Sequence, residues 1–382
     1  MIRRLCVVPI AGLLLAGAVS WTASGTPSGA ASSAGIEKTT CKPAHPSTCS
    51  LRDLADRLGL RIGTTIAASR LGDATYAGLL SGQFNSVTPE NDLKWLLVQP
   101  TPGDWQFGAA DTDLSFAEAN HIEFWGHNLI YNQDENNAPW VRSLTNPDQL
   151  RQAVKTEIQT VVGRYRGRIH RWDVVNEPLA TGGTKRQKSV FQRLLGPRWI
   201  DWCFRLAHEA DPSAELWLNE YGTEWVPGKF QAMVKLVKGM QRRGVPIQGV
   251  GLELHGTSTS GPDVATLLAE MRTLSHMGLD IAYTEVDVPI PPRDQKALRL
   301  QAHAYGRIVS TCLQVSRCRE ITTWGLDDGH TWLDHRGWFP TPTRPLLFAK
   351  DLAPKPAFTA VQSCLARGVL ASSQYKPACP GS

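Results

Sequence analysis

The chain has little of what marks a nucleic-acid-binding or membrane protein. Its 382 residues carry 40 Lys and Arg against 35 Asp and Glu, and two of the positive charges, Arg3 and Arg4, lie at the N-terminus. The remaining excess is small and not clustered, which excludes a basic patch for phosphate backbones or anionic lipids. No apolar run after residue 20 is a candidate to span a bilayer. We therefore predict neither a nucleic-acid nor a membrane partner.

Signatures of metals and organic cofactors are also missing. No cysteine spacing resembles a zinc knuckle, no glycine loop is suited to phosphate, and no lysine outside the stretch around Lys94 is a Schiff-base candidate. The sequence thus predicts no metal and no cofactor. No Pro/Ser/Thr-rich linker follows residue 40, so we expect no appended binding module. Tryptophan is frequent, with 13 against 7 tyrosines, and flat indole rings suit sugar faces, although most would be core.

The N-terminus reads as an export signal. Arg3 and Arg4 precede the apolar run from Leu5 to Val19, and small residues that suit cleavage follow. We predict a signal peptide over 1–20, a disordered Ser/Gly/Ala-rich leader over 21–40, a folded barrel over 41–365 and a C-terminal surface extension over 366–382. The protein is expected to be secreted, and nothing in the sequence predicts an oligomer, so we expect a monomer.

Seven cysteines remain after the leader, and six of them form three sequence-local pairs. The pairs are Cys41 with Cys49, Cys312 with Cys318, and Cys364 with Cys379. In an exported protein such pairs favour disulfides, the alternative for each being an unbridged structural thiol. Cys203, in a helix-like stretch, would then be a lone buried thiol.

Short β-type apolar runs alternate with amphipathic, helix-like segments such as 149–165, 197–210 and 229–243. The predicted strands are Arg61–Ala67, Phe84–Thr88, Ile122–Leu129, Ile169–Asn176, Glu215–Asn219, Gly249–Leu254, Asp280–Glu285 and Ile321–Gly325. Eight strand–helix repeats predict an α/β fold of the (β/α)₈ TIM-barrel type with parallel strands.

Polar residues gather where these strands end, which is where such barrels carry their chemistry. In strand order they are Glu90, Asn91 and Lys94; His127; Asn176 and Glu177; Tyr221; Glu253 and His255; Glu285 and Asp287; and Trp324. Few other placements of a site would collect so many polar groups from so many strand ends.

Glu177 and Glu285 each end a β-type run, and two carboxyls across a barrel mouth are the minimal equipment for breaking a glycosidic bond. One must be protonated to help the leaving oxygen, and the other ionised to attack. A partly apolar setting beside Trp172 gives Glu177 the acid/base role. His255 can hydrogen-bond Glu285 and keep it charged, which gives Glu285 the nucleophile role. Either glutamate alone reads more readily as a structural ion-pair member; the pairing favours catalysis.

The other strand-end residues have two readings each. Glu90, Asn91 and Lys94 would bind sugar hydroxyls, but the segment from Thr88 also reads as a helix N-terminus with Pro at the first position. His127 is either a ligand-binding histidine or a satisfied core residue. Trp324 and Trp332 are either a lid over a sugar ring or core packing.

Taken in order, these stretches resemble glycoside hydrolase family 10, whose best-known members are endo-β-1,4-xylanases. The stretches are Val87–Trp95 (VTPENDLKW), Gly126-His127, Trp172–Glu177 (WDVVNE), Gly249–His255 (GVGLELH), Thr284–Asp287 (TEVD), and Trp324–Asp328 (WGLDD) with Trp332. Each motif alone is weak to moderate, but six in order at sensible spacing are specific and cover nearly the whole barrel.

The resemblance implies double displacement with net retention and no metal or cofactor. Glu285 would attack the anomeric carbon, while Glu177 would protonate the leaving sugar and then deprotonate water, with the carboxyls ~5–5.5 Å apart. Asn176 would bind the 2-hydroxyl of the attacked sugar. The Cys312 and Cys318 pair also falls where the family often has a disulfide.

The chain departs from the family pattern along the cleft wall. Tyr131 and Asn132 stand where a tryptophan and a histidine are usual, Glu253 replaces a glutamine, and Glu220 and Gly222 replace Asp and Asn in the fifth-strand motif. The catalytic pair is untouched.

Three functions therefore compete. The first is a secreted endo-1,4-β-xylanase. The second is a retaining β-glycosidase of the same family with another glycan as substrate, which the wall residues Tyr131, Asn132 and Glu253 would decide. The third is a sugar-binding barrel without catalysis, which the presence of both glutamates disfavours.

Overall fold

The computed structural model describes residues 40–180, 182–185, 189–226, 228–256, 263–291 and 295–371. The expected signal peptide, the leader to residue 39, Cys379 and the extension after residue 371 lie outside the described residues.

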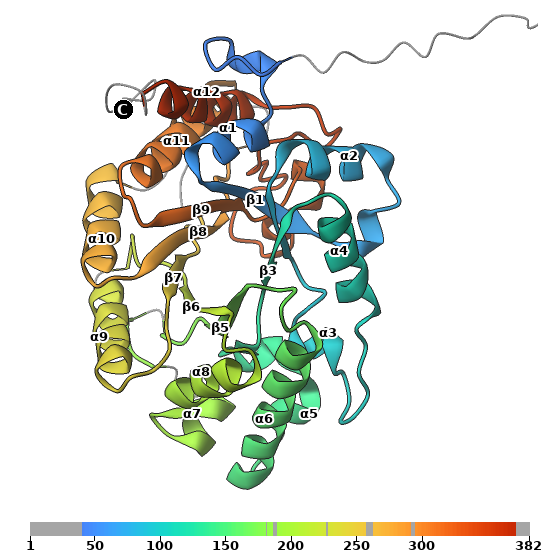
Figure 1. The fold of residues 1–382 in the computed structure, drawn as a ribbon, viewed down its shortest axis with the longest axis vertical. Helices are drawn as coiled ribbons and strands as arrows, with labels where there is room; N and C mark the ends of the chain where they lie inside the picture. The colour runs from blue at the N-terminus through green and yellow to red at the C-terminus, as the bar shows by residue number, and fades with distance from the viewer. Residues whose placement is uncertain are drawn as a thin grey trace, which may run out of the picture. The chain divides into compact units, whose positions relative to one another are not determined.

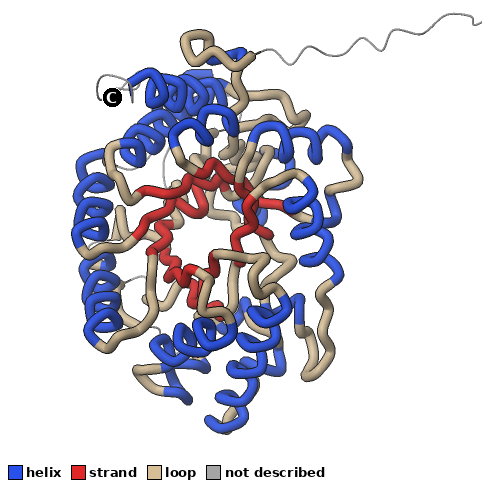
Figure 2. Tube along the Cα trace, in the orientation of Figure 1, coloured by secondary structure: helices blue, strands red, loops and turns tan. Residues whose placement is uncertain are grey.

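The strands form one closed parallel barrel, seen as a ring with helices outside it in Figure 2. The strands are β1 Arg61–Ile66, β2 Ser86–Pro89, β3 Glu123–Gly126, β4 Ile130–Tyr131, β5 Arg171–Asn176, β6 Glu215–Glu220, β7 Gly249–Leu252, β8 Asp280–Val286 and β9 Cys318–Thr323. Their order is β3-β2-β1-β9-β8-β7-β6-β5-β4, and pairing of β3 with β5 closes the ring. The predicted (β/α)₈ barrel is confirmed.

The third strand of the barrel differs from its prediction, because it consists of two short strands rather than one. Both β3 and β4 pair with β5, so together they occupy one strand position of the barrel. At the end of β3 the backbone lies so close to Trp172 that a Cβ on Gly126 would meet its ring at 2.3 Å. Only glycine permits this approach, and beyond it the chain turns His127 inward before pairing resumes.

The helices cover the outside of the barrel (Figure 1). They are α1 Leu51–Leu58, α2 Ala74–Gln83, α3 Trp95–Val98, α4 Gly108–Ala119, α5 Pro139–Arg142, α6 Pro147–Arg164, α7 Val190–Leu195, α8 Trp199–Ala210, α9 Lys229–Arg242, α10 Val264–His276, α11 Gln295–Leu313 and α12 Pro356–Ala371. The three predicted helical segments correspond to α6, α8 and α9. Asn146 caps α6 by accepting from the backbone N–H groups of Asp148 and Gln149, whereas α8 and α9 begin without a side-chain cap.

Arg171 closes the N-terminal end of the barrel. Its guanidinium contacts Glu123 at 3.1 Å, Glu215 at 3.1 Å and Glu320 at 2.8 Å. Glu320 is fully buried, and although burial raises the pKa of its carboxyl, the cation opposes that rise. A paired charge in this position fills the barrel end away from the site.

The structure contains the Cys41–Cys49 and Cys312–Cys318 disulfides, with Cα atoms 4.4 and 5.3 Å apart. Cys203 is a free, buried thiol as expected. The proposed partner of Cys364, Cys379, lies outside the described residues. None of the helices in the described ranges has the length and apolar character needed to cross a bilayer.

Glu157 on α6 gives a testable consequence of burial. Its side chain is 0% exposed, neither of its oxygens has a hydrogen-bond partner, and burial raises its pKa well above the ordinary value. The folded state therefore holds a proton that the unfolded chain releases above about pH 4.3. The contribution of Glu157 to the free energy of unfolding is fully present below that pH. It falls by about 1.4 kcal/mol per pH unit as the pH rises toward the raised pKa of the folded state.

We expect Glu157→Gln to flatten the fall of the unfolding free energy between pH 5 and pH 8, measured by urea denaturation. Glu118→Gln is the matched control, since Glu118 is an exposed partner of Arg168 whose pKa is lowered by that pair. An unchanged slope in the Glu157 variant would mean that this carboxyl is ionised in the folded protein.

Candidate active site

Glu177 follows directly on β5 at the C-terminal mouth of the barrel. It is 6% exposed, and its backbone has φ +51°, a left-handed conformation that is uncommon for a residue with a side chain. Its N–H donates to the carbonyl of Asn219 at 2.9 Å, and Pro178 follows. This turn projects the carboxyl off the strand and into the site.

Donors from the segment after β3 hold the Glu177 carboxyl. Tyr131 Oη donates to Oε1 at 2.5 Å, and Gln133 Nε2 contacts Oε2. Asn132 donates to the backbone carbonyls of Glu177 and Pro178 at 3.3 and 3.2 Å. Two of the predicted wall residues therefore position Glu177, one by its side chain and one by its backbone.

Glu285 lies near the end of β8 and is 5% exposed. Asn219 Nδ2 donates to Oε1 at 2.7 Å, and His255 Nε2 lies 3.3 Å from Oε2. Burial alone would raise the pKa of Glu285, but the hydrogen bond from His255 and the charges of His127, His255 and Lys94 together lower it. The structure thus keeps this carboxyl ionised while it is buried.

Asn219, the next-to-last residue of β6, connects the two carboxyl-bearing strands. Its Nδ2 lies 2.8 Å from Asn176 Oδ1 and 3.2 Å from Glu253 Oε1, besides its contact with Glu285. Its Oδ1 accepts from Thr284 at 2.6 Å, which fixes the direction of the amide. The sequence predicted Asn219 only as the end of a strand, and its position opposite Asn176 follows from the pairing of β5 with β6 in the structure.

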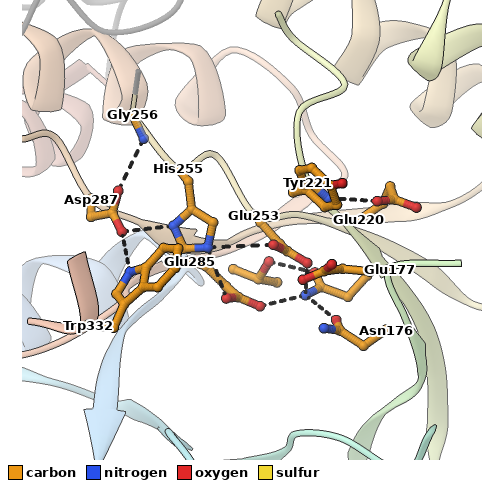
Figure 3. Close-up of polar contacts among 12 residues, drawn as sticks. Asn176, Glu177, Glu220, Tyr221, Glu253, His255, Gly256, Glu285, Asp287 and Trp332 are labelled. Atoms are coloured by element: carbon orange, nitrogen blue, oxygen red, sulfur yellow. Dashed lines mark hydrogen bonds and ion pairs between the residues drawn. The ribbon is translucent and has the colours of Figure 1, made fainter. Parts of the chain in front are cut away.

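His255 bridges Glu285 and Asp287. Its Nδ1 lies 2.8 Å from Asp287 Oδ2, which also accepts from Trp332 Nε1 at 2.9 Å (Figure 3). Burial lowers the pKa of His255, but Asp287 and Glu285 outweigh burial and raise it to about 10. The imidazole is therefore a cation at neutral pH, which is what holds Glu285 as a carboxylate.

Glu253 is the third carboxyl of the site. It is 1% exposed, and burial together with the charges of Glu285 and Glu177 raises its pKa well above the ordinary value. A neutral carboxylic acid has the shape and polarity of an amide, so Glu253 takes the place of the glutamine that the family pattern has there.

One group among the described residues has metal-ligand geometry: Glu253, His255 and Glu285 offer atoms within 4.8 Å of one another. A metal ion bound there would have to displace the proton that Asp287 and Glu285 favour on His255. The set is therefore better suited to holding the charge of Glu285 than to holding an ion.

Lys94 faces the carboxyls from the segment after β2. Burial lowers the pKa of its ammonium, whereas Glu285, Glu90 and Glu177 raise it. Its Nζ donates to Asn91 Oδ1 at 3.0 Å and lies 5.9 Å from the ring of Trp324. The alternative reading as a helix N-terminus is wrong, because Pro89 is the last residue of β2 and the next helix, α3, begins only at Trp95.

His127 and Trp324 lie side by side at the floor of the site. The ring centroids are 5.0 Å apart at 73°, and His127 Nδ1 lies 2.9 Å from Asp173 Oδ2. His127 is 1% exposed, and Trp324 is 6% exposed. The buried contact with Asp173 fits the reading of His127 as a satisfied core residue, and binding of a sugar by its ring stays a prediction.

Tyr221 borders the site next to Glu177 (Figure 3). Lys229 Nζ lies 3.2 Å from the centroid of the Tyr221 ring and 2.8 Å from Glu220 Oε1. Both Lys229 and Glu220 are 0% exposed. This ion pair was not anticipated from the sequence, because nothing in the helix-like pattern of 229–243 separates a buried lysine from a solvated one.

A parallel barrel whose mouth carries one ionised buried carboxyl and a second carboxyl held by proton donors is built for breaking glycosidic bonds. Comparison with known proteins agrees. The sequence pattern described as "Glycosyl hydrolase family 10" matches residues 50–364, and the chain belongs to this family. It is therefore a glycoside hydrolase, as its sequence predicted.

Named relatives and solved structures support the same placement. The chain is 35% identical over 306 residues to endo-1,4-beta-xylanase 1 of Gibberella zeae, covering 78% of this chain and 85% of that protein. It is 36% identical over 294 residues to endo-1,4-beta-xylanase A of Fusarium oxysporum f. sp. lycopersici, covering 75% and 88%. Native xylanase 10B from Thermotoga maritima superimposes with a TM-score of 0.79 at 30% identity, covering 84% of this chain and 99% of that chain.

Proposed function

We propose that this protein is a secreted endo-1,4-β-xylanase that acts by double displacement, with Glu285 as nucleophile and Glu177 as acid/base. The observation that carries the proposal is the state of Glu285. It is 5% exposed, yet Asn219, His255 and Lys94 hold it ionised at the strand end facing Glu177. A buried carboxylate that neighbouring donors and cations keep ionised is suited to act as a nucleophile rather than as a structural acid.

In the first step Glu285 attacks the anomeric carbon, and Glu177 gives its proton to the oxygen of the leaving sugar. A covalent glycosyl ester on Glu285 forms as the glycosidic C–O bond breaks, and the developing charge on the sugar ring is stabilised by the carboxylate. Asn176, whose Oδ1 accepts from Asn219, would bind the 2-hydroxyl of that sugar. Lys94, Asn91 and Glu90 would bind hydroxyls of the neighbouring sugar.

In the second step Glu177, now ionised, takes a proton from water, which attacks the anomeric carbon and releases Glu285. The donors Tyr131 and Gln133 stabilise the ionised Glu177 between the two steps. His255 remains a cation in both steps, and it stabilises the Glu285 carboxylate when that group is released. Retention requires the two carboxyls to lie ~5–5.5 Å apart, and the sugar configuration of the first product, followed by NMR, tests it.

The substrate assignment rests on relatives. Proteins 35–36% identical to this chain are named endo-1,4-beta-xylanases, and a related xylanase 10B from Thermotoga petrophila, 29% identical with a TM-score of 0.79, was solved with xylobiose. Product analysis on unbranched xylan, arabinoxylan, mixed-linkage glucan and carboxymethyl cellulose tests it. We expect a ladder of xylo-oligosaccharides from the two xylans; products from the glucans alone would overturn the substrate while keeping the mechanism.

The alternative is a retaining β-glycosidase of this family with a different glycan. Tyr131 and Gln133 on Glu177, and the acid Glu253 beside Asn219, are the observations that favour it, because they change the polar lining of the cleft. The same panel of glycans decides between the two. Export is supported by the leader sequence and tested by N-terminal sequencing of protein recovered from culture medium.

Tyr131→Phe tests the role of the phenol hydroxyl. Burial and the nearby carboxylates raise the pKa of Tyr131 well above its ordinary value, so it remains a donor to Glu177 at every working pH. Hydrogen bonding to the ionised form favours that form, so loss of the hydroxyl lets Glu177 keep its proton to higher pH. We expect the basic limb of the kcat/KM profile to move up by about one pH unit.

Tyr165→Phe is the matched control, because its hydroxyl also donates to a carboxylate, Asp111 at 2.9 Å, but on the outer helices. It should leave the pH profile unmoved. A basic limb that stays in place in the Tyr131 variant would show that this hydroxyl does not govern the proton on Glu177.

A further inference from the structure

Trp225 is an exposed aromatic side chain beside the mouth of the barrel. It lies in the segment between β6 and α9 and is 43% exposed, and of the other described tryptophans only Trp338 is also exposed. Its ring lies next to that of Tyr221, with centroids 6.5 Å apart and planes at 45°. Exposing a large ring costs free energy of hydration, so an exposed ring that adjoins the mouth of the barrel indicates a contact surface.

Gly222 is what allows Trp225 to lie there. Its backbone has φ +68°, and a Cβ added to it would come within 2.9 Å of Trp225 Cζ2 and 3.1 Å of Cε2. The turn is closed by a bond from Val226 N to Gly222 O at 2.9 Å. The family pattern has Asn at this position, so the exchange to glycine clears the space into which the indole packs.

One face of the Tyr221 ring packs against a buried lysine. The Lys229 ammonium, 3.2 Å from the ring centroid, is buried under the ring and paired with Glu220. The second oxygen of Glu220 accepts from the backbone N–H of Leu179 at 2.8 Å, two residues after Glu177. The ring that adjoins Trp225 is thereby tied to the loop that carries the proposed acid/base.

The position of this pair defines which part of a substrate it meets. Figure 3 shows Tyr221 on the side of Glu177, away from Trp332 and His255. The leaving sugar must lie on the side of the group that protonates it. A chain leaving the site past Glu177 therefore leaves on the side of Tyr221, whose ring adjoins that of Trp225.

We propose that Trp225, packed on Gly222, is a sugar-stacking subsite for the leaving-group side of a β-1,4-linked chain, one ring beyond Tyr221. The inference rests on the proposed function, since it takes Glu177 as the acid. Binding energy gained by a remote sugar is used to place the scissile bond, so the subsite favours bonds that leave a longer fragment on this side. It makes Trp225 a specificity residue for internal cleavage.

The test is the frequency with which each bond of a reducing-end-labelled xylohexaose is cut, read by mass spectrometry of the products. Bond frequencies are an internal ratio, so they do not depend on the amount of active enzyme. We expect Trp225→Ala to move cleavage toward the reducing end, lowering the ratio of inner to terminal cuts roughly 2- to 12-fold, the range of a single aromatic contact.

Two further variants complete the test. Gly222→Asn restores the family residue, which tolerates the left-handed backbone, and should shift the pattern as Trp225→Ala does because it displaces the indole. Trp338→Ala is the control: Trp338 is also exposed, at 64%, but packs on Trp332 at the opposite side of the site. It should not move cleavage toward the reducing end.

A wild-type pattern in both Trp225→Ala and Gly222→Asn would overturn the subsite while leaving the xylanase proposal intact. If the wild type cuts no xylohexaose, the proposed substrate fails instead. The same ratio is then measured on hexaoses of the glycan that the panel shows to be cut, where a shift supports the subsite and an unmoved pattern overturns it.

Discussion

Replacement of Glu285 by alanine is expected to lower kcat at least about 10⁴-fold, as loss of a nucleophile does in other covalent catalysts. The physical reason is that no other described group is placed to take over. Glu253, the neighbouring acid, is held protonated by burial and by the very charge that Glu285 carries. Initial rates on the polymer that the enzyme cleaves, with folding checked by circular dichroism, measure the loss.

Chemical rescue gives the stereochemical proof. Azide can occupy the space left by the carboxylate in Glu285→Ala and attack an activated aryl glycoside, which yields an α-glycosyl azide from a β-linked substrate. Glu118→Gln, which removes an exposed surface carboxylate, should keep wild-type rates. Full activity in Glu285→Ala, or rescue that yields the β-azide, would remove Glu285 from the nucleophile role.

Replacement of Glu177 by alanine should affect substrates according to their leaving groups. General acid help is worth about 10²- to 10⁴-fold, and a sugar leaving group needs it whereas an activated phenol does not. We therefore expect a large loss on xylo-oligosaccharides and a small loss in the first step on dinitrophenyl glycosides. Pre-steady-state release of the phenol separates that step from hydrolysis of the ester, which also needs Glu177 as base.

Azide again distinguishes the roles, because in Glu177→Ala it replaces the water of the second step and yields the β-glycosyl azide. The matched control is Gln133→Ala, which removes a contact to the same carboxyl but not the proton. Its losses should be smaller and independent of the leaving group. Equal losses on both substrate types in Glu177→Ala would argue that another group is the acid.

Much of the fold followed from local pattern. Each predicted strand overlaps an observed one, because these segments are rich in β-branched and aromatic residues and are followed by polar residues. The prediction was weakest at the third strand position of the barrel, which β3 and β4 share, and around Glu90. There the outcome depended on how closely β3 approaches Trp172 and on β2 pairing with β1 as far as Pro89, which are contacts between distant segments.

Side-chain partners were less predictable. The contact of His255 with Glu285 was anticipated, but the contacts of Gln133 with Glu177, of Asn219 with three strands and of Lys229 with Tyr221 were not. Each joins segments that only the closed barrel brings together. Exposure of Trp225 belongs to the same class, since it depends on a glycine three residues earlier and on the ring of Tyr221.

The sequence by itself determined the barrel, the family and the positions of the two glutamates, because strand periodicity and motif spacing are properties of neighbouring residues. The tertiary structure decided the protonation of the site. Whether a carboxyl is ionised depends on its burial and on charges a few ångströms away, and these come from strands that are remote in sequence. Hence Glu285 is a carboxylate and Glu253 an acid, although both are glutamates that follow a β-strand pattern.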